Sequence, residues 1–207
     1  MTTSNSPVNN QISADEALQR LIEGNRRFVR GEVHFPSVPS DVLAELAMGQ
    51  RPYALILGCS DSRVPPELIF GAGLGQLFVV RVAGNSLSPE VAGSLQYAGV
   101  HLNTRLFVVL GHEGCGAIQA ALKTKWQGPS ERSHIQMLVD RILPALSAVD
   151  PDLDPEAQLA QGVEANVRRT VRQIAESPEG QLRLQEGGIK LVGAIYEFAT
   201  GRVRFLE

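Results

Sequence analysis

The sequence predicts an α/β fold: a mostly parallel central sheet with flanking helices, an antiparallel edge strand and an N-terminal helical arm. Short apolar runs typical of buried strands occur at 53–57, 77–82 and 105–110. Helical patterns separate these runs, and strands that alternate with helices are typical of a parallel sheet. The last two strand-like runs, 189–198 and 203–206, are joined by a short turn and predict a closing hairpin with an antiparallel edge.

The composition favours one domain. With 207 residues, of which 43% are hydrophobic, the chain is long enough to bury one core, and no linker-like stretch divides it. We expect a disordered leader at 1–12 and a single domain at 13–207, in which 13–50 forms the arm. A net charge of -3 with scattered basic residues gives no reason to expect a nucleic-acid partner.

The apolar runs also exclude a membrane protein. They fall far below the roughly 18 residues that cross a bilayer. The first residues are polar and lack the apolar core of a signal peptide. Only two cysteines are present, too few for a disulfide framework. We therefore expect a cytoplasmic protein with no membrane contact and with a small molecule or a second copy of itself as its partner.

The arm begins with a clear helix signal. Ser13 followed by Glu16 has the spacing of a capping box, and apolar residues recur at helical spacing until Gly31. A second, shorter helix is predicted at 41–48, and Gly49 ends it. The amphipathic arm needs a surface to cover, either the core of its own chain or a second subunit, and the sequence leaves both open.

The elements that follow are predicted from proline, glycine and apolar spacing. Prolines near the start of two segments predict one helix that begins at 65–67 and another that spans about 88–102. The glycine-rich segment 71–75 precedes a strand rather than following one, so it is a turn and not a nucleotide-binding loop. Further helices are predicted at 114–125, 131–147 and 155–176, and 178–185 is a short segment to which we assign no structure.

Two loops carry the residues most capable of chemistry. Cys59-Ser60-Asp61-Ser62-Arg63 follows one predicted strand, and His112 to Cys115 follows another. Ligands bind beyond the carboxyl ends of strands in open α/β sheets, so the two loops can converge. Two thiolates and an imidazole suit zinc, and three protein ligands leave one position open for catalysis. Asp61 and Arg63 can form a bidentate pair beside the metal.

Other interpretations of these residues stay open. The two cysteines could form a disulfide, although a reducing compartment favours metal binding. A structural zinc is normally closed by four Cys or His ligands, and this chain has no third cysteine. A Cys-His pair could act as a thiol nucleophile, which would survive a chelator. Asp61 and Arg63 could also form a plain loop salt bridge.

These paired motifs, in this strand order, resemble those of β-class carbonic anhydrases of the plant type, over about residues 13–206. The resemblance implies reversible, zinc-dependent hydration of carbon dioxide to bicarbonate, on a dimer or a multiple of dimers whose arms embrace neighbouring subunits. It implies that Cys59, His112 and Cys115 bind Zn²⁺. It also implies that Asp61 and Arg63 form a catalytic dyad that orients a zinc-bound hydroxide for attack on the substrate.

The resemblance extends to a substrate pocket. Gln50 falls where plant-type members have a glutamine that hydrogen-bonds a substrate oxygen, either within one chain or across a dimer interface. Phe78, Ala83 and Tyr97 fall where the family lines an apolar pocket beside the metal, whereas pattern alone favours plain packing for Phe78 and Tyr97. His101, one helical turn after Tyr97, is a candidate proton shuttle or simply a surface histidine.

One departure from the family concerns regulation. Members with an inhibitory bicarbonate site carry a tryptophan three residues before the first cysteine ligand, where this chain has Ile56. We therefore expect an open site, with Asp61 off the metal. Two other functions remain: hydrolysis of carbon disulfide or carbonyl sulfide with the same ligands, and a zinc-stabilised scaffold or bicarbonate sensor without turnover. The intact dyad of Asp61 and Arg63 argues against the scaffold.

Overall fold

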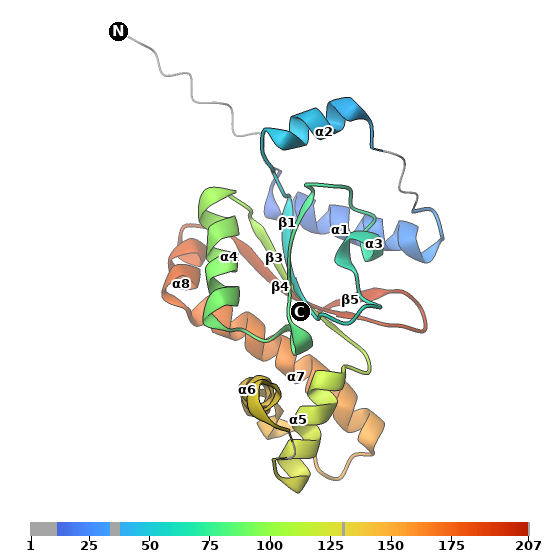
Figure 1. The fold of residues 1–207 in the computed structure, drawn as a ribbon, viewed down its shortest axis with the longest axis vertical. Coiled ribbons are helices and arrows are strands. Elements are labelled where there is room, and N and C mark those ends of the chain that lie inside the picture. Colours follow the sequence, from blue (N-terminus) through green and yellow to red (C-terminus); the bar gives the residue numbers. More distant parts are fainter. Residues whose placement is uncertain (1–11, 34–37, 130, 207) are drawn as a thin grey trace.

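The strands and helices alternate as the sequence predicts, and the α/β fold class is confirmed (Figure 1). The computed structural model describes residues 12–33, 38–129 and 131–206, so the leader predicted at 1–12 lies almost entirely outside the described residues. Five strands form one sheet in the order β2-β1-β3-β4-β5. The first four are parallel, and the last is the predicted antiparallel edge. They are β1 (Ala54–Gly58), β2 (Leu77–Arg81), β3 (Leu106–His112), β4 (Lys190–Tyr196) and β5 (Val203–Leu206).

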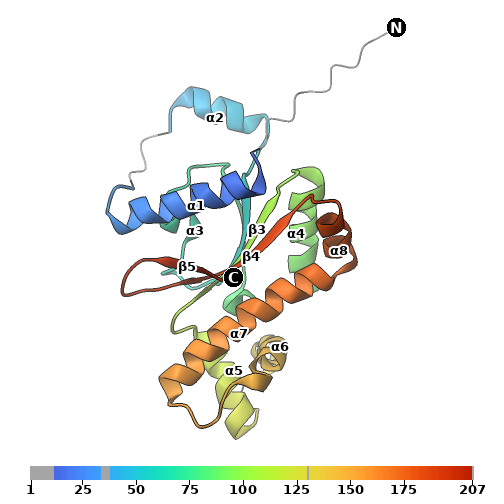
Figure 2. The ribbon, with the colours of Figure 1, turned by 180° about the vertical axis from the view of Figure 1, so that it is seen from behind.

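Helices cover both faces of the sheet because its central strands are apolar on both sides. In β1, Leu55 and Leu57 face one core cluster while Ala54 and Ile56 face the other. One cluster is completed by α4 (Pro89–His101), α5 (Gly116–Gln127), α6 (Ser133–Ile142) and α7 (Pro155–Glu176). The other is completed by α1 (Ala14–Val29) and the short α3 (Pro66–Ile69), and Figure 2 shows α1 lying across that face.

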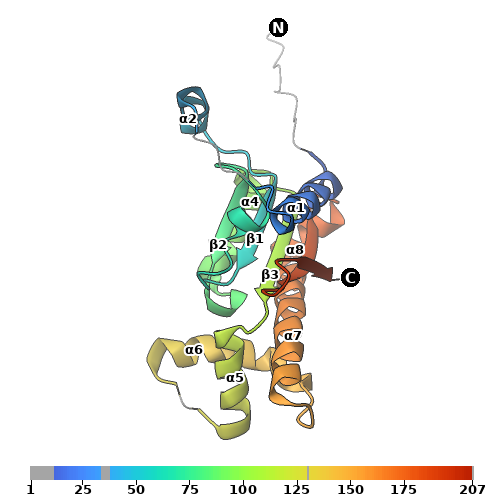
Figure 3. The same ribbon diagram turned by 90° about the vertical axis from the view of Figure 1, so that its right-hand side faces the viewer.

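The two helices of the arm behave differently. In α1 the Ser13 and Glu16 capping box forms as predicted, and Ala17 and Leu21 are fully buried against the sheet of the same chain. In contrast, α2 (Ser40–Ala47) has no buried residue. Figure 3 shows α2 at one end of the molecule, standing away from the sheet. The chain's own core therefore covers α1 but leaves α2 with an uncovered surface.

Two expectations for the second half of the chain were incomplete. The helix predicted over 131–147 is broken, because α6 ends at Ile142 and a 3-10 segment, η2 (Leu143–Ala148), follows it. Pro144 lacks the amide hydrogen that an α-helix needs at this point. The unassigned segment 178–185 is a helix, α8 (Pro178–Gln185), whose amino end is capped by Ser177. The glycine-rich segment at 71–75 is a turn, as predicted, with positive φ at Gly71 and Gly75.

The topology places the two chemical loops side by side. β1 and β3 are hydrogen-bonded neighbours in parallel register, with Gly58 opposite Leu110. Their carboxyl ends therefore lie at the same edge of the sheet, next to α5 (Figure 1). Cys59 follows β1 directly, and His112 is the last residue of β3.

Candidate metal centre

The sulfur of Cys59 is held by a tight turn of a neighbouring segment. The 3-10 turn η1 (Ala83–Asn85) follows β2, and within it the Gly84 N–H donates to Cys59 Sγ at 3.3 Å. Gly84 has a φ of 67°, and a Cβ at this position would lie 2.7 Å from Ile142 Cδ1. Only glycine fits this turn without strain, so the residue allows the amide to approach the sulfur.

His112 presents one ring nitrogen to the centre. Its side chain is fully buried, and its Nδ1–H donates to the Glu113 carbonyl oxygen at 2.8 Å. The Nε2 atom has no hydrogen-bond partner among the described residues, although a buried polar atom normally has one. A backbone acceptor at Nδ1 fixes the tautomer that leaves the Nε2 lone pair free, which is the usual arrangement of a metal-binding histidine.

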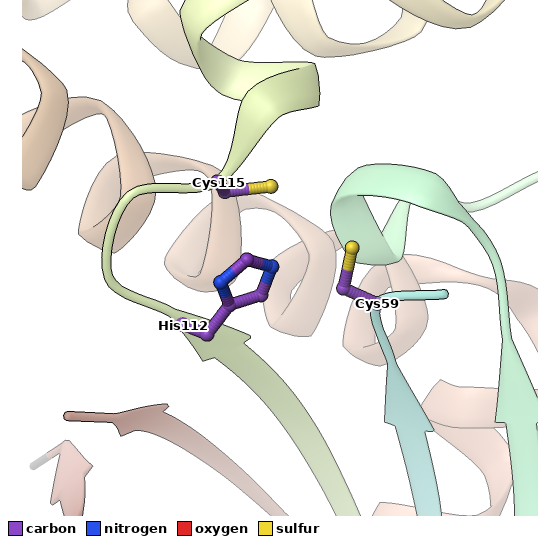
Figure 4. A group of neighbouring side chains, drawn as sticks. All are labelled: Cys59, His112 and Cys115. Carbon is purple, nitrogen blue, oxygen red and sulfur yellow. The ribbon is translucent and has the colours of Figure 1, made fainter. Parts of the chain in front are cut away.

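Cys115 completes the cluster from the amino end of a helix. It is the N-cap residue of α5, and its sulfur points toward Cys59 and His112 (Figure 4). The ligand atoms of the three residues lie within 4.8 Å of one another, and all three residues are buried. Tetrahedral zinc with Zn–S bonds of about 2.3 Å separates two sulfurs by about 3.8 Å. The donor set and its spacing therefore fit a zinc ion with one open position.

The two sulfurs do not ionise independently. The Cys115 thiol donates toward the Cys59 sulfur and, with the Gly84 N–H, lowers the pKa of Cys59 below its usual range despite its burial. The same hydrogen bond, together with burial and the charge of Cys59, raises the pKa of Cys115 above its usual range. One thiolate forms readily, and the second needs a compensating positive charge. A divalent cation supplies that charge.

Asp61 and Arg63 form a bidentate ion pair at the edge of this cluster. Arg63 Nε donates to Asp61 Oδ1 at 2.9 Å, and Nη2 donates to Oδ2 at 2.8 Å. The guanidinium holds the pKa of the Asp61 carboxyl well below its usual range, so the group is ionised. Its Oδ2 lies 3.9 Å from His112 Nε2. An oriented carboxylate therefore stands beside the position where a metal would bind.

A second arginine, which sequence reasoning missed, braces the Cys59 loop. Arg81 is the last residue of β2, and its guanidinium donates to the Cys59 carbonyl oxygen at 2.9 Å and to that of Asp61 at 2.5 Å. These bonds fix the backbone on both sides of Ser60. The available signal was a charged residue near the end of an otherwise apolar strand, beside the loop that carries Cys59.

The predicted pocket residues do not all lie at this centre. Ala83 belongs to the turn whose glycine contacts Cys59 Sγ. Gln50 lies before β1, at the opposite end of a five-residue strand that spans roughly 17 Å. Phe78 and Tyr97 contact each other, with ring centroids 6.3 Å apart, and the tilted rings of Tyr97 and His101 have centroids 4.9 Å apart. This aromatic group lies toward the end of the sheet where the strands begin.

Comparison with known proteins identifies the family. A family model described as "Carbonic anhydrase" matches residues 54–203, most of the chain. The solved β-carbonic anhydrase CcaA is 29% identical, with a TM-score of 0.74, over 92% of this chain and 95% of its own. The chain belongs to the β-class carbonic anhydrase family. The Cys2His cluster at the carboxyl ends of β1 and β3 is thus the candidate zinc centre of a β-carbonic anhydrase.

Other carbonic anhydrases match over nearly the same length. "Carbonic anhydrase 2" of Mycobacterium tuberculosis is 40% identical over 95% of this chain and 93% of its own. A carbonic anhydrase of Synechococcus elongatus is 33% identical over 90% of this chain and 70% of its own. A Coccomyxa β-carbonic anhydrase solved with acetazolamide is 28% identical, with a TM-score of 0.75, over 91% of this chain and 86% of its own.

Proposed function

We propose that this β-carbonic anhydrase hydrates carbon dioxide reversibly to bicarbonate and a proton at a zinc ion held by Cys59, His112 and Cys115. One observation carries the assignment of residues. The buried His112 Nε2 has no partner in the described chain, and it faces two cysteine sulfurs beside an ionised, oriented carboxylate. A scaffold would require the ligands but not the pair formed by Asp61 and Arg63.

The chemistry divides between the metal and the chain. Zinc, when bound, acts as a Lewis acid that makes water a nucleophile near neutral pH. Asp61 is ionised, so its Oδ2 accepts the hydrogen of the reacting water and orients the attacking lone pair. Arg63 engages both carboxylate oxygens and keeps the group charged and in place. The methyl group of Ala83 suits an apolar substrate that offers few hydrogen bonds.

The assignment is tested by stopped-flow hydration of carbon dioxide. We expect activity in the zinc-loaded protein, loss to background after the metal is removed with a chelator, and recovery when zinc is restored. Carbon disulfide and carbonyl sulfide, assayed in parallel, should be poorer substrates. Full activity after verified removal of the metal would point instead to a thiol enzyme. A sulfur substrate preferred over carbon dioxide would reassign the reaction.

We also propose that a second copy of the chain completes the substrate pocket. Gln50 is exposed, Tyr97 is 49% exposed and Met48 is 89% exposed, although the last two are large and apolar. Because Gln50, Phe78 and Tyr97 lie away from the zinc ligands of their own chain, they would contact substrate only at a partner's centre. The uncovered α2 provides further surface for such a dimer, or for a multiple of dimers.

Mixing two inactive variants tests this sharing of sites. In a mixed dimer of Asp61→Asn and Gln50→Ala chains, one site carries both defects and the other carries neither. Dissociating and reassociating equal amounts should therefore restore about a quarter of wild-type activity, since half the dimers are mixed. In the control mixture, Asp61→Asn chains are combined with Gln119→Ala chains in place of Gln50→Ala chains. Gln119 lies on exposed helix surface outside the proposed site. Activity no greater than the average of the unmixed variants would contradict shared sites.

We further propose a cytoplasmic location. Both cysteines are buried in the candidate metal site and form no disulfide, which suits a reducing compartment. Within residues 12–33, 38–129 and 131–206, no helix is both long and apolar enough to cross a bilayer.

A further inference from the structure

An aromatic ring from the far end of the chain contacts both the ion pair and a zinc ligand. Phe198 follows β4, and the Arg63 guanidinium carbon lies over its ring, 4.2 Å from the centroid. The same ring meets the His112 imidazole in a T-shaped contact, with centroids 5.5 Å apart and planes at 67°. One side chain thus bridges the two residues that flank Asp61 Oδ2.

Phe198 is itself fixed from two directions. Its backbone N–H donates to Glu113 Oε2 at 2.9 Å, and the Glu113 N–H donates to the Tyr196 carbonyl oxygen at 3.0 Å. These reciprocal bonds join the loop that follows β3 to the turn that follows β4. The buried Tyr196 ring meets Phe198 edge-on at 5.4 Å. The position of the ring is therefore determined by backbone and packing rather than by Arg63 alone.

The turn that carries Phe198 is anchored to the N-terminal helix. Asn25 of α1, only 5% exposed, donates from Nδ2 to the Gly201 carbonyl oxygen at 2.9 Å. Its Oδ1 accepts from the Val203 N–H at 2.9 Å. These bonds hold the end of the turn and the start of β5 against α1. Phe198 therefore rests on a rigid support, as a side chain that orients another must.

We propose that Phe198 is a positioning residue for the dyad: its ring holds the Arg63 guanidinium in the orientation that presents Asp61 to the reacting atoms. The Arg63 side chain is 58% exposed, so water competes for its guanidinium and weakens the ion pair with Asp61. A ring below the guanidinium restricts its rotation and adds a cation-π attraction. The role of Arg63 in catalysis rests on the proposed function. The contact between Phe198 and Arg63 does not depend on that function.

The test compares an aromatic with an aliphatic side chain in the zinc-loaded enzyme. Phe198→Leu removes the ring face, and Phe198→Tyr keeps it. Phe205→Leu is the matched control, because Phe205 packs partly buried in the same cluster. Glu113→Ala and Glu113→Gln form a second pair at an exposed residue, where only glutamine retains an oxygen to accept the Phe198 N–H. This pair remains informative if Phe198→Leu fails to fold.

Two measurements give separate results. In ¹⁵N-arginine spectra, the Arg63 Nε–H signal is assigned by its loss in Arg63→Lys. This signal should shift in Phe198→Leu and Glu113→Ala, and stay near its wild-type position in Phe198→Tyr, Glu113→Gln and Phe205→Leu. In hydration assays, Phe198→Leu should lower kcat about tenfold with zinc content and KM unchanged, in line with the strength of a cation-π contact. Phe198→Tyr should restore kcat.

Each opposite result overturns the proposal. An Arg63 signal that does not move in Phe198→Leu shows that the ring does not hold the guanidinium. A moved signal with unchanged kcat shows that the contact has no part in positioning, and loss of kcat equal in Phe198→Tyr and Phe198→Leu shows that the aromatic face is irrelevant. Failure of the wild-type enzyme to hydrate carbon dioxide is a different result, which removes the proposed function and leaves the spectroscopic comparison intact.

Discussion

Replacing Cys115 with serine should leave the chain folded but abolish tight zinc binding and, with it, carbon dioxide hydration. A serine hydroxyl stays protonated and is a poor zinc ligand, whereas the thiolate is both charged and soft. Removing it leaves one sulfur and one imidazole, too few to hold the metal against a chelating buffer. We expect turnover to fall by roughly three orders of magnitude or more, since the metal supplies the nucleophile. Zinc content by mass spectrometry and stopped-flow hydration measure the two effects.

A substitution on the opposing loop serves as the control. Ser62→Ala changes an exposed residue between Asp61 and Arg63 and removes no ligand atom. It should keep one zinc per chain and near wild-type turnover. A Cys115→Ser protein that retains stoichiometric zinc and normal turnover would show that Cys115 is not a ligand. Loss of activity with zinc fully retained would mean that the sulfur acts in catalysis and not in binding the metal.

The meeting of the two loops could be predicted because it depends on local signals and one topological rule. Apolar runs marked β1 and β3 as buried strands, and parallel strands place their carboxyl ends at one edge. Cys59 and His112 follow from that rule without knowledge of any side-chain contact. The capping box at Ser13 and the turn at 71–75 were predicted for the same reason, since each depends on neighbours a few residues away.

Features that depend on distant contacts could not be predicted. Arg81 reaches the carbonyl oxygens of Cys59 and Asp61 only because β2 lies beside β1 in the folded sheet. Phe198 meets Arg63 because β4 ends near β1 on the other side of β3. No periodicity in the sequence encodes either contact. The break at Pro144 was available from the sequence, but the strong apolar pattern around it predicted a continuous helix.

Replacing Asp61 with asparagine should lower kcat while zinc remains bound. The two side chains have nearly the same shape, but the amide carries no negative charge and has only one acceptor oxygen. Its NH₂ group would also point a donor at the Arg63 guanidinium, where the carboxylate accepts two hydrogen bonds. Loss of the group that orients the reacting atoms typically costs about 100-fold in rate. Stopped-flow hydration at saturating substrate, with zinc content measured on the same sample, gives the result.

The defect of the Asp61→Asn variant should not depend on pH in the neutral range. Arg63 lowers the pKa of the Asp61 carboxyl, so the wild-type carboxylate stays ionised until the pH falls below the usual range of the group. The defect of Asp61→Asn should therefore persist across about pH 5 to 9, where an unperturbed aspartate is also charged. Asp140→Asn, an exposed change on α6, is the matched control and should behave as wild type. An Asp61→Asn enzyme within twofold of wild type would remove Asp61 from the reaction, because no other carboxylate is paired with Arg63 in the described structure.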